Sequence, residues 1–140
     1  MTSPDKMKIL LSKVGLDGHD RGIKVLSQMF RDAGAEVIYL GRYQTAENIA
    51  AAALQEDVDV VGLSFLSGEH LFFTRRVLDQ LKEKGVGCGL IVGGTIPAAD
   101  VPLLKEMGAE EVFRAGSKVE DIIRFVEEKV TARRQRQTKR

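Results

Sequence analysis

The sequence predicts an α/β fold in which a parallel sheet carries helices on both faces. Three observations favour this fold. Short apolar runs alternate with longer amphipathic stretches five times along the chain. One of these runs, residues 58–63 (VDVVGL), is nearly continuous, as expected of a central parallel strand buried on both faces. The length of 140 residues suits one domain with one core.

The first two strand–helix units are predicted from apolar spacing and from residues that start or stop a helix. Residues 7–11 (MKILL) predict the first strand. Apolar side chains recur at helical spacing over about residues 20–33, and Gly34 follows as a stop. Residues 36–40 (EVIYL) predict the second strand, and Thr45 is the expected cap of the alanine-rich helix after it.

The other elements follow by the same reasoning. After the central strand come helices near residues 70–84, 97–107 and 119–130 and strands at 90–92 and 111–113. This alternation favours a flavodoxin-like, doubly wound sheet of five strands in the order 2-1-3-4-5. The connecting loops are short except after the first strand, where residues 12–19 make a longer excursion.

Composition and charge bound the rest of the chain. We expect an N-terminal extension over residues 1–6, a folded domain over 7–131 and a disordered basic tail over 132–140. The last eight residues (RRQRQTKR) hold five basic side chains and no apolar one. The net charge of +1 gives no field that would favour nucleic acid or a membrane surface. No apolar run approaches the roughly 20 residues of a membrane helix, and the N-terminus lacks the apolar stretch of a signal peptide.

Cysteine and histidine are scarce. Cys88 is the only cysteine, so no disulfide can form within the chain, and a reducing, cytoplasmic location is expected. Inert packing at a strand edge is its expected role, since no paired base is visible. With two histidines and one cysteine, a structural zinc site is not expected, so any metal chemistry must arrive with a cofactor that already holds its metal.

Ligands of doubly wound sheets bind beyond the carboxyl ends of the strands, at the switch point between the first and third strands. Four loops should meet there: residues 13–22, 64–68, 93–95 and 114–117. In the first loop, Asp17 lies two residues before His19, and a metal-ligating histidine usually donates its other N–H to such a carboxylate. Lys13 could neutralise Asp17. The alternative is an unpartnered histidine on a surface loop.

Glycines and a serine mark the other loops. Gly93 and Gly94 follow a buried strand, which indicates either a tight strand-to-helix turn or the close approach of a bulky group. Ser64 ends the apolar central strand and could hydrogen-bond a ligand or cap the next helix. His70 begins that helix, where a capping or surface role is expected.

These residues together resemble a known fingerprint. Three motifs, in this order and spacing, are similar to those of cobalamin-binding domains with a Rossmann-like fold: Asp17-x-His19-x-x-Gly22, Ser64-x-Leu66 and Gly93-Gly94. The string KVGLDGHDRG (residues 13–22) resembles the B12-binding domain of acyl-CoA mutases such as methylmalonyl-CoA, isobutyryl-CoA and 2-hydroxyisobutyryl-CoA mutase. The resemblance covers about residues 7–126.

The resemblance implies a role for each matched residue. His19 would bind the cobalt of adenosylcobalamin from below in place of the cofactor's own base, Asp17 would hydrogen-bond His19, and Lys13 would contact Asp17. The displaced base and its sugar-phosphate tail would lie against Gly22, Ser64, Leu66, Gly93, Gly94, Gly116 and Ser117. One segment departs from the family: residues 113–117 are Phe-Arg-Ala-Gly-Ser, where mutases often have Phe-Gly-Pro-Gly-Thr. By the same resemblance, His70 could border the corrin rim.

The family also implies a reaction and a partner. Adenosylcobalamin supports a radical rearrangement of the carbon skeleton of an acyl-CoA. The substrate is held by a TIM barrel of about 250 residues, which this chain is too short to contain. A separate large subunit is therefore expected, with no catalytic residue in this chain. The acyl group stays open, because the barrel selects it.

Other classes of protein share the fold. A corrinoid carrier of a methyl-transfer system would bring a helical cap domain before the first strand, where six residues precede Met7. A cobalamin-binding regulator would need a DNA-binding module, and the basic tail lacks aromatic side chains for stacking on bases. A receiver-like signalling domain would need an aspartate at the end of the third strand, where this chain has Ser64.

Overall fold

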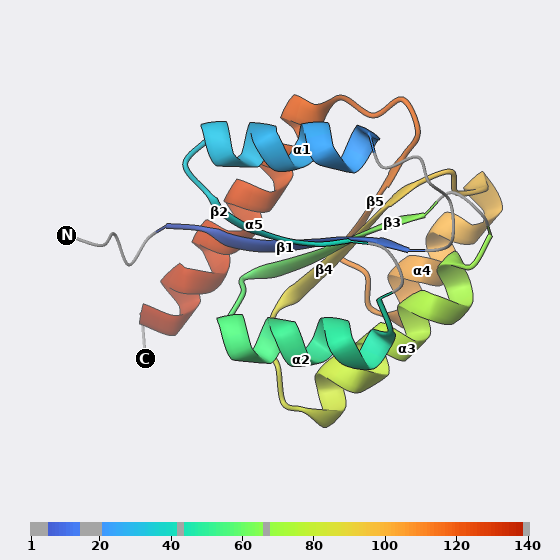
Figure 1. The fold of residues 1–140 in the computed structure, drawn as a ribbon, viewed down its shortest axis with the longest axis horizontal. Helices are drawn as coiled ribbons and strands as arrows, with labels where there is room; N and C mark the ends of the chain where they lie inside the picture. Colours follow the sequence, from blue (N-terminus) through green and yellow to red (C-terminus); the bar gives the residue numbers. More distant parts are fainter. Residues whose placement is uncertain (1–5, 15–20, 42–43, 66–67, 139–140) are drawn as a thin grey trace.

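The sheet has five parallel strands in the order β2-β1-β3-β4-β5, which confirms the predicted doubly wound topology (Figure 1). The computed structural model describes residues 6–14, 21–41, 44–65 and 68–138. The strands are β1 (Lys8–Val14), β2 (Glu36–Leu40), β3 (Val60–Phe65), β4 (Gly89–Gly94) and β5 (Glu111–Arg114). The helices are α1 (Arg21–Asp32), α2 (Ala46–Glu56), α3 (His70–Glu83), the short 3-10 turn η1 (Ala98–Asp100), α4 (Val101–Met107) and α5 (Val119–Thr138). None of the helices in the described ranges is long and apolar enough to cross a membrane.

Helices cover both faces of the sheet. The helices α1 and α5 lie on one face, and α2, α3 and α4 lie on the other (Figure 1). Alternate side chains of β1 enter the two layers: Leu10 packs under α2–α4, whereas Ile9 and Leu11 pack under α1 and α5. All three are at most 1% exposed. Burial on both faces explains why the run of apolar residues in this strand is continuous.

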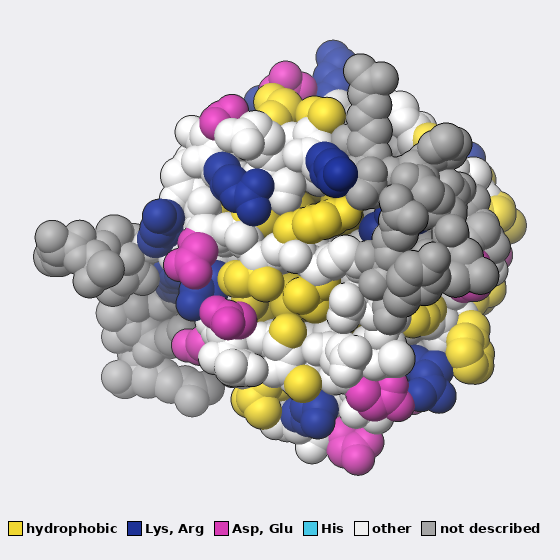
Figure 2. All heavy atoms as spheres, viewed as in Figure 1, with side chains coloured by type: hydrophobic (Ala, Val, Ile, Leu, Met, Phe, Trp, Pro, Cys, Tyr) yellow, Lys and Arg dark blue, Asp and Glu magenta, His cyan; other side chains and the backbone are white. Residues whose placement is uncertain are grey.

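The β2 edge of the sheet stays partly open to solvent. Residues 37–40 of this strand are only partly buried. Figure 2 shows apolar side chains gathered over this edge, between α1 and α2. The edge strand therefore differs from β1 and β3, which are covered by a strand on each side.

The register of the strands brings their carboxyl ends to one level. Lys13 of β1 pairs with Ser64 of β3, and Ser64 pairs with Gly93 of β4. Gly94 in turn pairs with Arg114 of β5. The described residues expected at the site therefore share one end of the sheet, called the carboxyl edge below. The opposite end is called the amino edge.

The last helix is longer than the sequence suggested. Residues 132–138, expected to belong to a disordered tail, continue α5 as helix. Arg133 donates hydrogen bonds to the backbone oxygen of Asp59 at 2.8 Å and to Glu110 Oε2 at 3.1 Å. These acceptors lie far away in the sequence. A run of basic residues alone predicts a solvated tail, but here the folded domain provides hydrogen-bond acceptors for the run.

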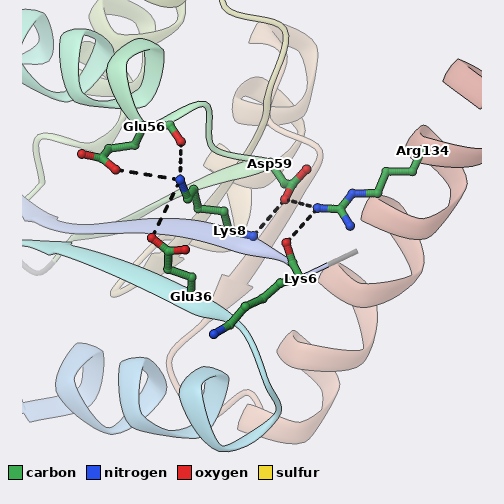
Figure 3. Close-up of polar contacts among 6 residues, drawn as sticks. All are labelled: Lys6, Lys8, Glu36, Glu56, Asp59 and Arg134. Carbon is green, nitrogen blue, oxygen red and sulfur yellow. Dashed lines mark hydrogen bonds and ion pairs between the residues drawn. The ribbon is translucent and has the colours of Figure 1, made fainter. Parts of the chain in front are cut away.

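The carboxylate of Asp59 lies among hydrogen-bonded and charged groups at the amino edge (Figure 3). Its carboxylate accepts hydrogen bonds from the backbone N–H of Lys8 at 2.8 Å and from Arg134 Nη2 at 2.9 Å. Arg134 also donates to the backbone oxygen of Lys6 at 2.9 Å. The end of α5 is thereby tied to the start of β1, at the edge opposite to the expected site.

Cys88 lies directly before β4, also at the amino edge. Burial raises the pKa of its thiol to about 11, although the nearby Arg133 acts in the opposite direction. At pH 8 we expect iodoacetamide to alkylate the native chain about a hundredfold more slowly than the urea-unfolded chain, since the thiolate is the nucleophile.

Mass spectrometry of timed samples measures this difference in alkylation rate cleanly, because the chain has one cysteine.

A thiol whose pKa is raised on folding stabilises the fold below its unfolded pKa. That contribution is lost as the pH rises from about 8.5 through the folded value. Equal alkylation rates for native and unfolded chains would contradict the inert role.

Candidate functional site

A cavity of about 290 Å³ lies at the carboxyl edge, between the sheet and the helices α1 and α5. The strands and the two helices both contribute apolar side chains to its wall: Leu11, Ile23, Leu26, Ile91, Phe113 and Ile122. The loop after β5, the ends of β3 and β4 and the start of α1 also line it. A larger hollow of about 670 Å³ at the amino edge is lined by none of the predicted site residues that the structure describes.

Six of the ten predicted site residues line the cavity at the carboxyl edge: Gly22, Ser64, Gly93, Gly94, Gly116 and Ser117. Lys13 lies at the end of β1, beside Ser64 in the register. Asp17, His19 and Leu66 lie outside the described residues. The predicted residues that the structure describes are thus brought to one edge of the sheet.

Lys13 is an unusual buried cation. The residue is 2% exposed, and its Nζ has no hydrogen-bond partner within the part of the chain that the structure describes. A buried charge without a partner is costly. A hydrogen-bonding or charged partner for Lys13 would therefore have to come from outside the described side chains.

The glycines of the cavity are needed for different reasons. Gly94 has a φ of +116°, and a Cβ there would overlap the backbone oxygen of Phe65, so the turn itself requires glycine. At Gly93 a Cβ would lie 3.3 Å from a backbone oxygen, which is tight. Among the residues that the structure describes, no atom lies within 4 Å of a Cβ placed at Gly22 or at Gly116, and Gly116 takes a φ of +96°. Open space for a ligand is thus a property of Gly22 and Gly116 rather than of Gly94.

Ser117 and Arg114 shape the turn after β5. The Oγ and the backbone N–H of Ser117 both donate to the backbone oxygen of Arg114, at 2.7 and 3.0 Å. The Nε of Arg114 donates to the backbone oxygen of Ile96 at 2.8 Å and so joins the loops after β4 and β5. The sequence shows Arg114 only as a departure from the family pattern, because its partner lies 18 residues away.

His70 is neither a helix cap nor a surface residue, so that expectation is wrong. It is the first residue of α3 and is 4% exposed. Its Nε2 lies 2.7 Å from Oδ2 of Asp100. Its position in the sequence suggests a cap, but the approach of η1 in the folded chain buries it. His70 does not line the cavity.

The apolar part of the cavity could not be predicted. Leu26 recurs at helical spacing with core residues of α1, and Phe113 belongs to a strand. Apolar periodicity shows which face of an element is buried, but it does not distinguish a core side chain from a cavity wall. The described residues contain no group of three or more His, Cys, Asp or Glu side chains that could hold a metal ion.

The chain matches the family model described as B12 binding domain over residues 7–124. It is 41% identical over 128 residues to the 2-hydroxyisobutanoyl-CoA mutase small subunit of Aquincola tertiaricarbonis, covering 91% of this chain and 94% of that protein. It is 40% identical over 121 residues to the pivalyl-CoA mutase small subunit of Xanthobacter autotrophicus, covering 86% and 81%. The methylmalonyl-CoA mutase of Rhizobium meliloti is 40% identical over 131 residues, which are 92% of this chain and 18% of that longer protein.

A solved structure shares the architecture. A cobalamin-binding protein from Desulfitobacterium hafniense superposes with a TM-score of 0.76 at 25% sequence identity. The superposition covers 89% of this chain and 59% of that one, so this chain corresponds to little more than half of the solved protein.

Proposed function

Because the chain belongs to the family of B12-binding domains, we propose that it is the cobalamin-binding small subunit of an adenosylcobalamin-dependent acyl-CoA mutase. The two relatives that it matches over most of their length are named as mutase small subunits. Longer methylmalonyl-CoA mutases contain the matching segment as 16–18% of their chain. This pattern supports a separate large subunit, which we propose holds the acyl-CoA in a TIM barrel and selects the acyl group.

The observation that carries the proposal is the cavity at the carboxyl edge. We propose that it receives the displaced base and the sugar-phosphate tail of cobalamin. Its apolar wall suits the faces of a flat aromatic base. No other described residue occupies the space next to Gly22 or Gly116 where a side chain would stand. Ser64 supplies a hydroxyl among the lining residues.

Lys13 supports the assignment of the cobalt ligand. Its buried ammonium needs an anion, and Asp17 is the carboxylate that we propose for it. Asp17 would also accept a hydrogen bond from one ring nitrogen of His19, which leaves the other nitrogen to bind the cobalt. A lysine, a carboxylate and a histidine would then form one chain of contacts below the cofactor.

The chemistry belongs to the cofactor. When bound, adenosylcobalamin supplies the radical chemistry of the carbon-skeleton rearrangement. The residues of this chain bind the corrin and orient it, and none of them is a catalytic residue. We place the complex in the cytoplasm, since an unpaired cysteine suits a reducing compartment. The proposal includes no membrane or nucleic-acid partner.

Filling the cavity tests this function. The full chain is titrated with adenosylcobalamin, with and without a mutase large subunit, and the visible spectrum is followed. Leu26→Trp places a large side chain in the cavity and is expected to weaken binding about tenfold or more. Val25→Trp is the matched control. Val25 precedes Leu26 on α1, but its side chain is exposed and does not line the cavity.

Two outcomes would contradict the proposal. If the wild-type chain does not bind adenosylcobalamin either alone or with the large subunit, the chain is not a cobalamin-binding subunit. If Leu26→Trp binds cobalamin as tightly as Val25→Trp does, the cavity does not hold the nucleotide tail.

A further inference from the structure

We propose that His70 and Asp100 act as a positioning pair that sets the ends of β3 and β4, and with them the cavity wall formed by Ser64, Gly93 and Gly94. The inference rests on the proposed function, since it gives the pair an effect on how the cobalamin tail is held. Neither His70 nor Asp100 lines the cavity. The effect is therefore transmitted through the strands.

The pair joins the starts of two helices. His70 opens α3, and Asp100 is the last residue of η1, directly before α4. The contact of 2.7 Å joins Nε2 of His70 to Oδ2 of Asp100, and in the tautomer that carries its proton on Nε2 the ring donates to the carboxyl oxygen. A hydrogen bond to a charged group, at this length and mostly shielded from water, is one of the stronger side-chain contacts in proteins.

Both side chains serve this contact rather than a local cap. Asp100 is the N-cap residue of α4, yet its carboxylate makes no capping hydrogen bond. The Nδ1 of His70 is buried and finds no partner in the described ranges. Within those ranges, Asp100 is the one hydrogen-bond partner that orients the ring. The bond therefore joins the start of α3 directly to the start of α4.

Phe65 connects the pair to the strand ends. Its ring meets the ring of His70 edge-on, with the centroids 6.3 Å apart. Its backbone oxygen accepts a hydrogen bond from the N–H of Thr95 at 2.9 Å and lies against Gly94. A closed loop of contacts thus runs from the end of β3 through His70 and Asp100 to the segment that leaves β4.

The cavity lies on the other face of the same strand ends. Phe65 packs in the core under α2–α4, whereas the preceding residue, Ser64, lines the cavity under α1 and α5. Protein interiors are densely packed, so a shift of the strand ends on one face moves the wall on the other. Loss of the His70–Asp100 bond is therefore expected to deform the cavity although neither side chain touches the ligand.

Two substitutions of Asp100 test the pair in the full chain. Asp100→Ala removes the acceptor, and Asp100→Asn keeps an oxygen that can accept but removes the charge. Glu47→Ala is the matched control, because it removes an ion pair of the same 2.7 Å length with Arg76, on the exposed side of α2 and α3. Each protein is titrated with cobalamin and with cobinamide, a corrin without the nucleotide tail, at a temperature where far-UV circular dichroism shows it folded.

Asp100→Ala is expected to weaken cobalamin binding about tenfold and to leave cobinamide binding within about twofold of the wild type. Asp100→Asn should fall between the two, and Glu47→Ala should match the wild type for both corrins. An equal loss for both corrins, or wild-type cobalamin affinity in folded Asp100→Ala, would overturn the positioning role. A wild-type chain that binds neither corrin, alone or with the large subunit, would instead refute the proposed function.

Discussion

Replacing His19 with alanine is expected to abolish the base-off, His-on spectrum of the bound corrin and to weaken cobalamin binding by more than about 100-fold. The substitution removes the proposed cobalt ligand itself. Loss of only the carboxylate partner of a ligating histidine typically costs about 10- to 100-fold in metal affinity, so Asp17→Ala should have this smaller effect. Titration of each variant with hydroxocobalamin, followed by visible absorbance, measures both quantities.

The second histidine provides the control for this experiment. The chain has two histidines, and His70 bonds to Asp100 outside the cavity. His70→Asn is therefore expected to keep the His-on spectrum even where its affinity is lower. Added imidazole should restore the spectrum of His19→Ala, because it can occupy the vacated axial position. A His19→Ala variant with the wild-type spectrum and affinity would show that His19 is not the ligand.

The order of the strands could be predicted, but their ends could not. The apolar run of the first strand stops at residue 11, whereas β1 continues to Val14 because Ser12 and Lys13 pair with β3. The third strand is predicted over residues 58–63 and found at Val60–Phe65. Apolar content shows where a strand is buried, while the hydrogen-bond ladder decides where it ends.

The location of the site could be predicted from the topology, but the side-chain contacts around it could not. Parallel strands end at one edge, so loops that carry Ser64 and Gly93 were bound to meet once the strand order was known. The pair His70–Asp100 spans 30 residues and the pair Arg133–Asp59 spans 74. Contacts of this range depend on the packing of helices, which a single sequence does not reveal.

Gly94→Ala is expected to lower the free energy of unfolding by at least about 3 kcal/mol. Two costs combine at this position. The φ of +116° lies where side-chain-bearing residues are rare, and the new Cβ would overlap the backbone oxygen of Phe65. That oxygen is held by the N–H of Thr95, so it cannot withdraw without breaking a hydrogen bond. Urea unfolding followed by far-UV circular dichroism measures the loss.

Two other glycines separate backbone strain from atomic overlap. At Gly116 the φ is +96°, but no atom of the described residues lies within 4 Å of the new Cβ, so a smaller loss of about 1 kcal/mol is expected for Gly116→Ala. Gly22 has no positive φ and no atom of the described residues near its Cβ position, so alanine in this first turn of α1 should leave stability unchanged or raise it by up to about 1 kcal/mol. Since Gly22 lines the cavity, the methyl group of the introduced alanine should weaken the binding of cobalamin but not of cobinamide. Equal stability of the Gly94 and Gly22 variants would contradict the structural role of Gly94.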